Sequence, residues 1–344
     1  MIINALPTAA GTGFHMPAEW EPHERCWMAW PCRAETWGNN LGPTQRAYAN
    51  VANAISQFEP VTMLTLLQDV ENARSLCNEN VTIMPADIDD SWMRDNGPNF
   101  VVNDAGHLAA SIFHFNAWGG KYKPWAKDAA IGHRLAEHLG IPTFSAPIFM
   151  EGGGINVDGE GTLLTTEQCV LHENRNPGMQ KEEAEKIFHD SLGVEKVLWM
   201  PGDPEDTETD GHVDGIACFI ETGKVLVEIC PAEGTERYDN MQANLDAIRG
   251  ATDAKGRELE IVLIEEAYEA ERRNDIFASS YINFYIANGG IVMPRFGIDR
   301  DEDARKNLAA LFPDREVVQV DLSDIAIGGG GIHCITQQQP ALDK

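Results

Sequence analysis

The segment Gly328-Gly-Gly-Gly-Ile-His-Cys-Ile-Thr-Gln-Gln-Gln-Pro340 stands near the end of the chain and holds the features that decide its fold. Four consecutive glycines allow tight backbone bends and the close approach of a ligand. The run Ile332–Thr336 is typical of a strand, and it contains Cys334. Most free cysteines are small buried hydrophobic residues. This segment alone therefore leaves open whether Cys334 is structural or nucleophilic.

Four hairpin patterns precede this segment, each made of two strand-like runs around a turn that contains glycine. They are Asn99–Ile112, Ile155–Thr166, Val213–Ile229 and Tyr281–Met293. An amphipathic run of helical period follows each hairpin, and the four runs are Trp125–Leu139, Lys181–Leu192, Arg237–Ile248 and Asp301–Phe312. A further strand follows each helix, at Pro142–Ala146, Val194–Met200, Leu259–Glu265 and Glu316–Val320. The chain thus repeats a unit of strand, helix and strand.

The N-terminal part matches this unit but lacks one strand of the hairpin. Glu24–Trp30 is predicted as a strand, Thr44–Phe58 as a helix and Val61–Leu67 as the strand after it. If Ile332–Thr336 pairs with Glu24–Trp30, the missing strand is supplied and a ring closes, which removes free sheet edges. No linker interrupts the chain. We predict an α/β fold in which residues 1–344 form a single domain of five strand-helix-strand repeats.

The charge balance narrows the classes of partner. The 344 residues include 26 Lys and Arg but 54 Asp and Glu, a formal net charge of −28. Such a surface repels phosphate backbones and anionic lipids, so we expect neither nucleic acid nor membrane as a partner. It attracts small cations. Whether the chain forms a homo-oligomer stays open.

The cysteines and the N-terminus both favour a cytoplasmic protein. The seven cysteines are odd in number and include no Cys-x-x-Cys, so neither a disulfide framework nor a zinc knuckle is indicated. Reduced thiols fit a cytoplasm. Residues Met1 to Ala5 lack the basic and apolar regions of a signal peptide, and no apolar run is long enough to span a bilayer.

The connectors between units hold the unusual polar residues. They are Asp87–Pro98, Glu151–Gly154, Asp210–Gly215 and Gly328–Cys334. In a ring of similar units, equivalent connectors meet at one end of the central axis, and functional loops often converge on a rigid scaffold in this way. We therefore predict that these four connectors form one site.

Each candidate residue also has a structural interpretation. Asp95 could form a turn, Glu151 could be a surface acid, and His212 could be a structural histidine. Residues two apart on a strand share a face, so we expect His212 and Asp214 to project together. A catalytic zinc requires about three protein ligands. Beyond His212 and Asp214, the only further candidates are His333 and Cys334 near the chain end, so we expect no metal site.

One thiol, one imidazole and several carboxylates suit attack on a guanidinium carbon with loss of ammonia. Paired carboxylates bind the planar guanidinium through two hydrogen bonds, and a thiolate attacks an electrophilic carbon. Clamping by Asp95 and Asp214 would align this carbon with the sulfur of Cys334. His212 would protonate the leaving group and then activate water. The bound cation would favour the thiolate, which two acids alone would disfavour.

Several motifs stand together in the order of a known family. They are Trp92-Met-Arg-Asp95-x-Gly-Pro98, Asn116-Ala-Trp-Gly-Gly-Lys-Tyr122, Glu151-Gly-Gly, Asn174-Arg-Asn-Pro-Gly178, Gly211-His-Val-Asp214, Ala278-Ser-Ser-Tyr-Ile-Asn-Phe-Tyr285 and Ile332-His-Cys-Ile-Thr-Gln-Gln-Gln-Pro340. From Pro17 to Pro340 the chain resembles the agmatine deiminases (agmatine iminohydrolases), in the peptidylarginine-deiminase-like branch of the guanidine-modifying superfamily. The resemblance implies the pentein fold, a five-fold pseudo-symmetric α/β propeller. It implies hydrolysis of agmatine to N-carbamoylputrescine and ammonia in polyamine (putrescine) biosynthesis, with no metal or organic cofactor.

The family roles carry over onto the matching positions. The implied nucleophile, which forms the amidino-cysteine, is Cys334, and the implied general acid and base is His212. The implied guanidinium ligands are Asp95 and Asp214. The other implied site residues are a supporting acid, Glu151, and two pocket walls, Trp92 and Trp118, which could equally be core aromatic residues.

Four positions depart from the family pattern. Gly331, Asn96, Gly215 and Cys218 stand where the family usually has Asn, a small hydroxyl residue, Asn and Arg. The segment Pro201–Thr209 is also short. These departures affect recognition of the substrate tail, so a different small guanidino compound stays an alternative to agmatine.

Two further alternatives have weaker support. A metal-dependent amidino hydrolase that releases urea would need a dense motif such as Asp-x-His-x-Asp, which the sequence lacks. A non-catalytic propeller that binds polyamines would not need Cys334.

The substrate preference of a deiminase depends on the charges in the connectors. These connectors carry one basic residue, Arg94, beside three acids. The α-carboxylate of arginine would lack a partner there, so we expect a preference for agmatine.

Overall fold

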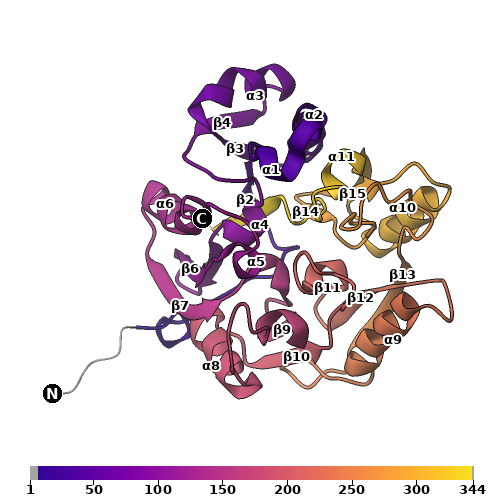
Figure 1. Cartoon of the computed structure of the whole chain (residues 1–344). Coiled ribbons are helices and arrows are strands. Elements are labelled where there is room, and N and C mark those ends of the chain that lie inside the picture. The colour runs from indigo at the N-terminus through magenta and orange to yellow at the C-terminus, as the bar shows by residue number, and fades with distance from the viewer. Residues whose placement is uncertain (1–6, 343–344) are drawn as a thin grey trace.

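The structure is a computed structural model that describes residues 7–342, and the chain forms five small sheets arranged in a ring (Figure 1). In every unit an antiparallel pair of strands is followed by a helix and then by a strand that pairs in parallel. The helices α2, α6, α8, α9 and α10 lie on the outside of the ring (Figure 1). The predicted fold class, a five-fold pseudo-symmetric α/β propeller, is confirmed.

The strands have the following bounds and orders. The first sheet, β17-β2-β3-β4, consists of Thr336–Pro340, His23–Ala29, Val61–Thr65 and Val81–Pro85. The second, β1-β5-β6-β7, consists of Phe14–His15, Asn99–Asn103, Leu108–His114 and Thr143–Phe149. The third, β10-β9-β8, consists of Lys196–Met200, Thr162–Thr166 and Ile155–Val157. The fourth, β11-β12-β13, consists of Ala217–Glu221, Lys224–Ile229 and Glu260–Glu265. The fifth, β14-β15-β16, consists of Tyr285–Ala287, Gly290–Arg295 and Glu316–Asp321.

The outer helices lie on the amphipathic runs of the sequence, although α6 begins six residues after the predicted start at Trp125. They are α2 at Leu41–Ile55, α6 at Ile131–Leu139, α8 at Lys181–Leu192, α9 at Glu236–Ile248 and α10 at Arg300–Leu311. The first unit carries an additional helix and strand that the repeat pattern did not predict, namely α3 at Val70–Leu76 followed by β4.

Helix α8 illustrates how the sequence places these elements. Ala184, Phe188 and Leu192 recur every four residues and are fully buried in a core shared with β7, β8 and β9. Burying a large apolar side chain of this kind stabilises the fold by about 1.5–3 kcal/mol. Gly193 ends the helix in the left-handed conformation, at φ 69°, which glycine adopts without a steric penalty.

The ring closes as predicted, but with a different strand. Thr336–Pro340, rather than Ile332–Thr336, pairs with β2, and Thr336 lies opposite Met28. The backbone N–H groups of His333 and Cys334 instead donate to the side-chain oxygen of Asn283, at 2.9 and 3.3 Å. Cys334 therefore lies in a turn just before β17 and not in a strand.

A second expectation about local structure is also wrong. His212 and Asp214 do not share a strand face, because Val213–Gly215 forms a 3-10 turn and β11 begins only at Ala217. The backbone turns here because the N–H of Ile216 bonds to the carbonyl of Val213 at 2.9 Å. The predicted hairpin Val213–Ile229 is thus four residues shorter at its start.

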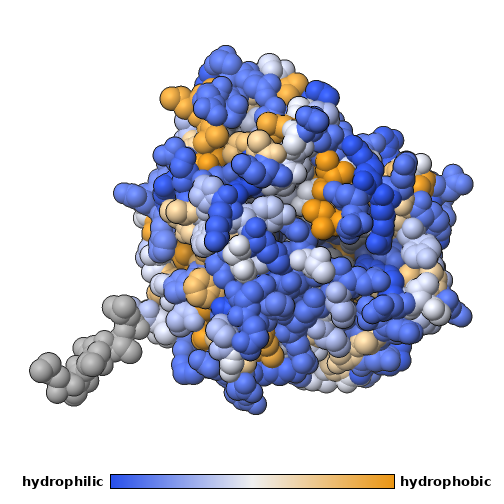
Figure 2. All heavy atoms as spheres, viewed as in Figure 1, coloured by the Kyte–Doolittle hydropathy of each residue, from blue (hydrophilic) through white to orange (hydrophobic). Residues whose placement is uncertain are grey.

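The visible face of the molecule is mostly hydrophilic, with apolar residues scattered over it (Figure 2). Within residues 7–342, none of the helices combines the length and apolar character needed to cross a bilayer. The expectation that Met1 to Ala5 are not a signal peptide falls outside the described residues.

Candidate active site

The polar connectors meet at the centre of the ring. The short helices α4 (Met93–Asn96) and α5 (Ala117–Gly120) lie there in Figure 1. A Cβ placed on Gly153 would lie 2.6 Å from His212 Nδ1, 2.9 Å from Asp95 Oδ1 and 3.1 Å from Asp214 Oδ2. Three side chains from two connectors therefore surround one point on the backbone of a third connector, and only glycine fits beneath them. The prediction that the connectors converge is correct.

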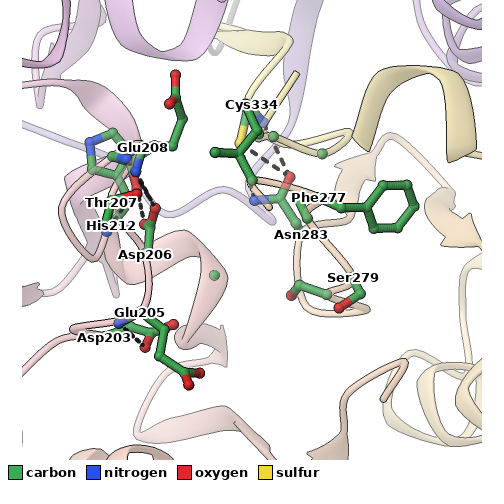
Figure 3. A pocket seen from close by; sticks show the side chains of 18 of the residues that line it. Asp203, Glu205, Asp206, Thr207, Glu208, His212, Phe277, Ser279, Asn283 and Cys334 are labelled. Carbon is green, nitrogen blue, oxygen red and sulfur yellow. Dashed lines mark hydrogen bonds between the residues drawn. The ribbon is translucent and has the colours of Figure 1, made fainter. Parts of the chain in front are cut away.

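Two cavities reach the sulfur of Cys334. The larger, of about 130 Å³, is lined by the buried residues His212, Asp214, Asn283 and Cys334 and by several acidic residues, among them Glu205, Asp206 and Glu208. Figure 3 shows His212 and Glu208 on one side of this cavity, with Cys334 and Asn283 facing them across it. The smaller cavity is lined by Trp92, Asp95, Trp118 and Glu208, and the last of these residues borders both.

Cys334 is buried beside a carboxylate and an amide. Its Sγ lies 3.4 Å from Asp214 Oδ2 and 3.3 Å from the side-chain nitrogen of Asn283. Burial and the nearby charges of Asp214 and Asp95 raise the pKa of the thiol well above its usual value. In the absence of a bound cation the group is therefore a protonated thiol, as the sequence argument predicted for two acids beside a sulfur.

His212 bridges the two acids at the back of the site. Its Nε2 lies 3.1 Å from Glu151 Oε2, and its Nδ1 faces Asp95 Oδ1 at 3.9 Å. Burial lowers the pKa of the imidazole, but the carboxylates of Asp95 and Glu151 outweigh burial and raise it well above the usual value. His212 is consequently an imidazolium that can donate a proton toward the cavity.

Asp95 and Asp214 differ in the groups that donate hydrogen bonds to them and in their pKa values. Asp95 Oδ1 accepts from the N–H of Gly153 at 3.0 Å, and Oδ2 accepts from Trp118 Nε1 at 2.9 Å. Burial raises the pKa of Asp95 to about 6 despite the charge of His212. Burial also raises the pKa of Asp214, but the hydrogen bond that it accepts from His333 Nδ1 at 2.9 Å helps to hold this pKa below the usual range.

Glu151 is fully buried and paired with an arginine. Arg175 Nε donates to its two oxygens at 3.1 and 2.8 Å, and Arg175 also bonds to Asp210 at 2.5 Å. Burial would raise the pKa of Glu151, but Arg175 and His212 lower it. Glu151 is therefore ionised, and it holds the imidazole of His212 from behind.

Glu151, His212 and Cys169 bring three possible metal-ligand atoms within 4.8 Å of one another. A cation entering there would be repelled by the guanidinium of Arg175, which already neutralises Glu151. This cluster therefore fits a metal ion poorly.

The tryptophans form an aromatic wall. Trp92 stacks on Trp37 with ring centroids 5.5 Å apart and meets Trp118 edge to face at 6.3 Å. Ala117 and Trp118 both have positive φ, at 56° and 54°, a strain that costs about 1–3 kcal/mol per residue and clusters at functional sites. The hydrogen bond from Trp118 Nε1 to Asp95 holds the ring in this position.

Close packing explains the glycine run before Cys334. A Cβ on Gly328 would lie 2.4 Å from the ring of Trp37, and one on Gly330 would lie 2.4 Å from the ring of Trp92. At Gly331 it would lie 2.3 Å from Asn283 Oδ1. Side chains from other parts of the chain therefore fill the space above this backbone, including the space that the asparagine of the family pattern would need.

The sequence argument gave no role to three residues that contact the site. Asn283 orients Cys334, and Arg175 neutralises Glu151; both lie inside quoted motifs, which was the available signal. Glu208 borders both cavities and accepts a 2.5 Å hydrogen bond from Tyr122. Its only signal was its place among acids shortly before His212.

Known proteins match this chain over nearly its whole length. A family model described as Porphyromonas-type peptidyl-arginine deiminase matches residues 15–340. An agmatine deiminase of Pseudomonas aeruginosa (strain LESB58) is 41% identical over 365 residues, covering 99% of both chains. The structure of an agmatine deiminase of Enterococcus faecalis has a TM-score of 0.94 at 36% identity, covering 98% of both chains. The substrate-bound agmatine deiminase of C. jejuni has a TM-score of 0.84 at 27% identity, covering 96% of this chain and 97% of that one.

Proposed function

The chain belongs to the Porphyromonas-type peptidyl-arginine deiminase family, and we propose that it hydrolyses agmatine to N-carbamoylputrescine and ammonia through an amidino-cysteine on Cys334. The observation that carries the proposal is the meeting of one imidazolium and two carboxylates around the backbone of Gly153, with the thiol of Cys334 3.4 Å from one of these carboxylates. We propose that the five repeats act together as a single catalytic domain. The seven free cysteines support a cytoplasmic location.

Substrate binding starts the reaction because the guanidinium supplies the missing positive charge. Asp95 and Asp214 bind its nitrogens and hold its carbon in front of the sulfur of Cys334. The cation opposes the effect of the two acids, so the pKa of the thiol falls and its proton passes to solvent. Cys334 is then a thiolate beside an aligned electrophile.

The first chemical step forms a carbon–sulfur bond and releases ammonia. The thiolate attacks the guanidinium carbon and gives a neutral tetrahedral adduct. His212 donates its proton to one terminal nitrogen, the carbon–nitrogen bond breaks, and ammonia leaves the cationic amidino-cysteine. Asp95, Asp214 and Glu151 stabilise the positive charge in this step.

The second step uses the same histidine as a base. His212, now neutral, takes a proton from water, and the oxygen attacks the amidino carbon. The carbon–sulfur bond breaks, Cys334 leaves as the thiolate, and one further proton passes to solvent. The larger cavity gives water a path to this carbon, because its lining includes His212 and Cys334.

Glu208 and the tryptophan wall suit the ammonium end of agmatine. Trp92, Trp118 and Glu208 line the smaller cavity, which ends at Cys334. Aromatic faces and a carboxylate both attract an ammonium group. We therefore assign tail binding to this cavity.

Product analysis and active-site trapping test the proposal together. Purified protein should release ammonia and not urea from agmatine, and a Cys334→Ala variant should lose at least about 10⁴-fold in kcat. A haloacetamidine should label Cys334, as mapped by mass spectrometry. The matched control is Cys230→Ala, since Cys230 is also buried but borders neither cavity. Release of urea, or inactivation by labelling at Cys169 or Cys218, would contradict the assignment.

A further inference from the structure

His333 precedes Cys334 in the chain and lies between two carboxylates. Its Nδ1 is 2.9 Å from Asp214 Oδ2, and its Nε2 is 2.9 and 3.1 Å from the two oxygens of Glu19. The imidazole is buried, as are both acids. None of the reaction steps above uses this histidine.

The contacts determine the protonation state of the ring. A neutral imidazole has only one N–H group, whereas an ionised carboxylate only accepts hydrogen bonds. The charges of His333 and Arg94 outweigh burial and lower the pKa of Glu19 to about 2, and the pKa of Asp214 is also lowered. Both neighbours are therefore acceptors at neutral pH, and His333 can bond to both only as an imidazolium.

The charged groups that face His333 are balanced. Arg94 bonds to Glu19 at 3.2 Å, and its other groups donate to Gln338 and to the carbonyl of His333. Burial and Arg94 lower the pKa of His333, but Glu19 and Asp214 raise it above the usual value. Two carboxylates thus meet one guanidinium and one imidazolium.

The same geometry orients Asp214. Its Oδ2 receives the bond from His333 and lies 3.4 Å from the sulfur of Cys334. Among residues 7–342, Asp214 Oδ1 has no hydrogen-bond donor, and Asp214 lines the larger cavity. One oxygen is therefore fixed, which leaves the other available for a ligand.

We propose that His333 is a positioning residue, held as an imidazolium by Glu19, that keeps Asp214 ionised and aimed at the guanidinium of the substrate. This role rests on the proposed function, because it acts through the guanidinium ligand Asp214. Glu19 is part of the same hydrogen-bonded arrangement, since it supplies the second carboxylate that fixes the ring of His333. Neither residue touches the reacting carbon.

A matched pair elsewhere in the core serves as the control. His23 Nδ1 lies 3.1 Å from Glu59 Oε2, and both side chains are as buried as those of His333 and Glu19. Glu59 bonds to Tyr285 and Asn288 at the closure of the ring, and the pair contacts neither Asp214 nor Cys334. The Nε2 of His23 does lie 3.0 Å from the backbone carbonyl oxygen of Glu19, so the control variant changes only Glu59 and leaves that contact in place.

Nitrogen-15 NMR of histidine-labelled protein tests the protonation state directly. In the wild type, both ring nitrogens of His333 should stay protonated at least to pH 8, whereas in Glu19→Gln the ring should lose one proton at a pH at least about one unit lower. The signal is assigned with His333→Gln. A neutral His333 in the wild type at pH 7 overturns the proposal, even if no variant folds.

The rate at which 2-chloroacetamidine alkylates Cys334 tests the positioning role. This small amidinium requires the carboxylates but no turnover of agmatine, so failure of the proposed function and failure of this inference are distinguishable. Glu19→Gln should shift the alkaline limb of the pH–rate profile down by about one unit, and His333→Gln should slow alkylation at least about tenfold. Glu59→Gln should lower Tm and leave the profile unchanged. An unshifted profile in Glu19→Gln, or an equal shift in Glu59→Gln, means that the pair is only structural.

Discussion

Asp95 and Glu151 are two buried acids that face opposite nitrogens of the same histidine, yet their protonation behaviour differs. Asp95 has its pKa raised to about 6, since burial dominates and no arginine pairs with it. Glu151 has its pKa lowered, because Arg175 and His212 outweigh burial. The two carboxylates therefore differ mainly in whether the fold gives them a permanent counter-charge.

This difference indicates where the substrate belongs. A carboxylate buried without a cation is costly, so an uncompensated acid at a cavity marks a place where a cationic ligand completes the site. Asp95 approaches this case, since Gly153 and Trp118 give it only neutral hydrogen bonds and the imidazolium of His212, 3.9 Å away, is shared with Glu151. Glu151 has its cation already and acts on His212 alone.

The largest expected effect is loss of activity when Asp95, the acid without an arginine partner, is removed. Asp95→Asn should lower kcat/KM for agmatine at least about 10- to 100-fold, because a dry charge-assisted pair is worth roughly 1.5–3 kcal/mol or more. Asp214→Asn should behave similarly. Circular dichroism and thermal melting should show an intact fold. Near-normal kinetics in both variants would refute the clamp.

Removing the compensated acid should instead reduce stability. Glu151→Gln leaves the buried guanidinium of Arg175 with Asp210 as its remaining carboxylate, which we expect to cost about 1–3 kcal/mol of unfolding free energy. Urea denaturation measures this loss, and Asp95→Asn is the comparison variant. The contrast between the two acids is wrong if Asp95→Asn destabilises the protein as much as Glu151→Gln.

The pH dependence of kcat/KM should reflect the ionisation of Asp95. Since agmatine requires the ionised carboxylate, kcat/KM should fall about tenfold per pH unit below about 6. The folded-state pKa is raised, so the native state binds more protons than the unfolded state between the usual value of 3.8 and about 6. Asp95 therefore lowers stability as the pH rises through this window. Pre-steady-state kinetics across pH 5–8 should find this limb in the wild type and not in Asp95→Asn.

The repeat pattern predicted most of the fold. Helix α8 has the bounds that its amphipathic run gave, because its four-residue apolar spacing is strong local information. The closing strand was misplaced, since the N–H groups of His333 and Cys334 bond to Asn283, which lies some fifty residues earlier in the chain. Such a contact leaves no local signal.

The site was predictable in part. Residue types in the connectors indicated which side chains meet, and Gly153 lies among His212, Asp95 and Asp214. The protonation behaviour of Glu151 and Asp214 was not predictable, because it depends on Arg175 and His333, whose distances from these acids only the fold sets. Glu208 was missed because one acid in a run of acids carries no distinguishing pattern.

The smallest expected effect concerns Glu208, a third acid whose pKa burial raises. It borders the smaller cavity, whose lining contains no Lys or Arg among the described residues, so the α-carboxylate of arginine would meet Glu208 without a counter-charge. We expect agmatine to exceed arginine in kcat/KM at moderate salt, and Glu208→Gln to reduce that ratio about tenfold, since one partly exposed charge pair contributes roughly 1–1.5 kcal/mol. The change should appear in KM, because the tail is remote from the reacting carbon. Arg272 lines the larger cavity but not the smaller one, so it is the alternative partner for the carboxylate of arginine. Equal or better turnover of arginine, lost in Arg272→Gln, would mean that the tail lies in the larger cavity.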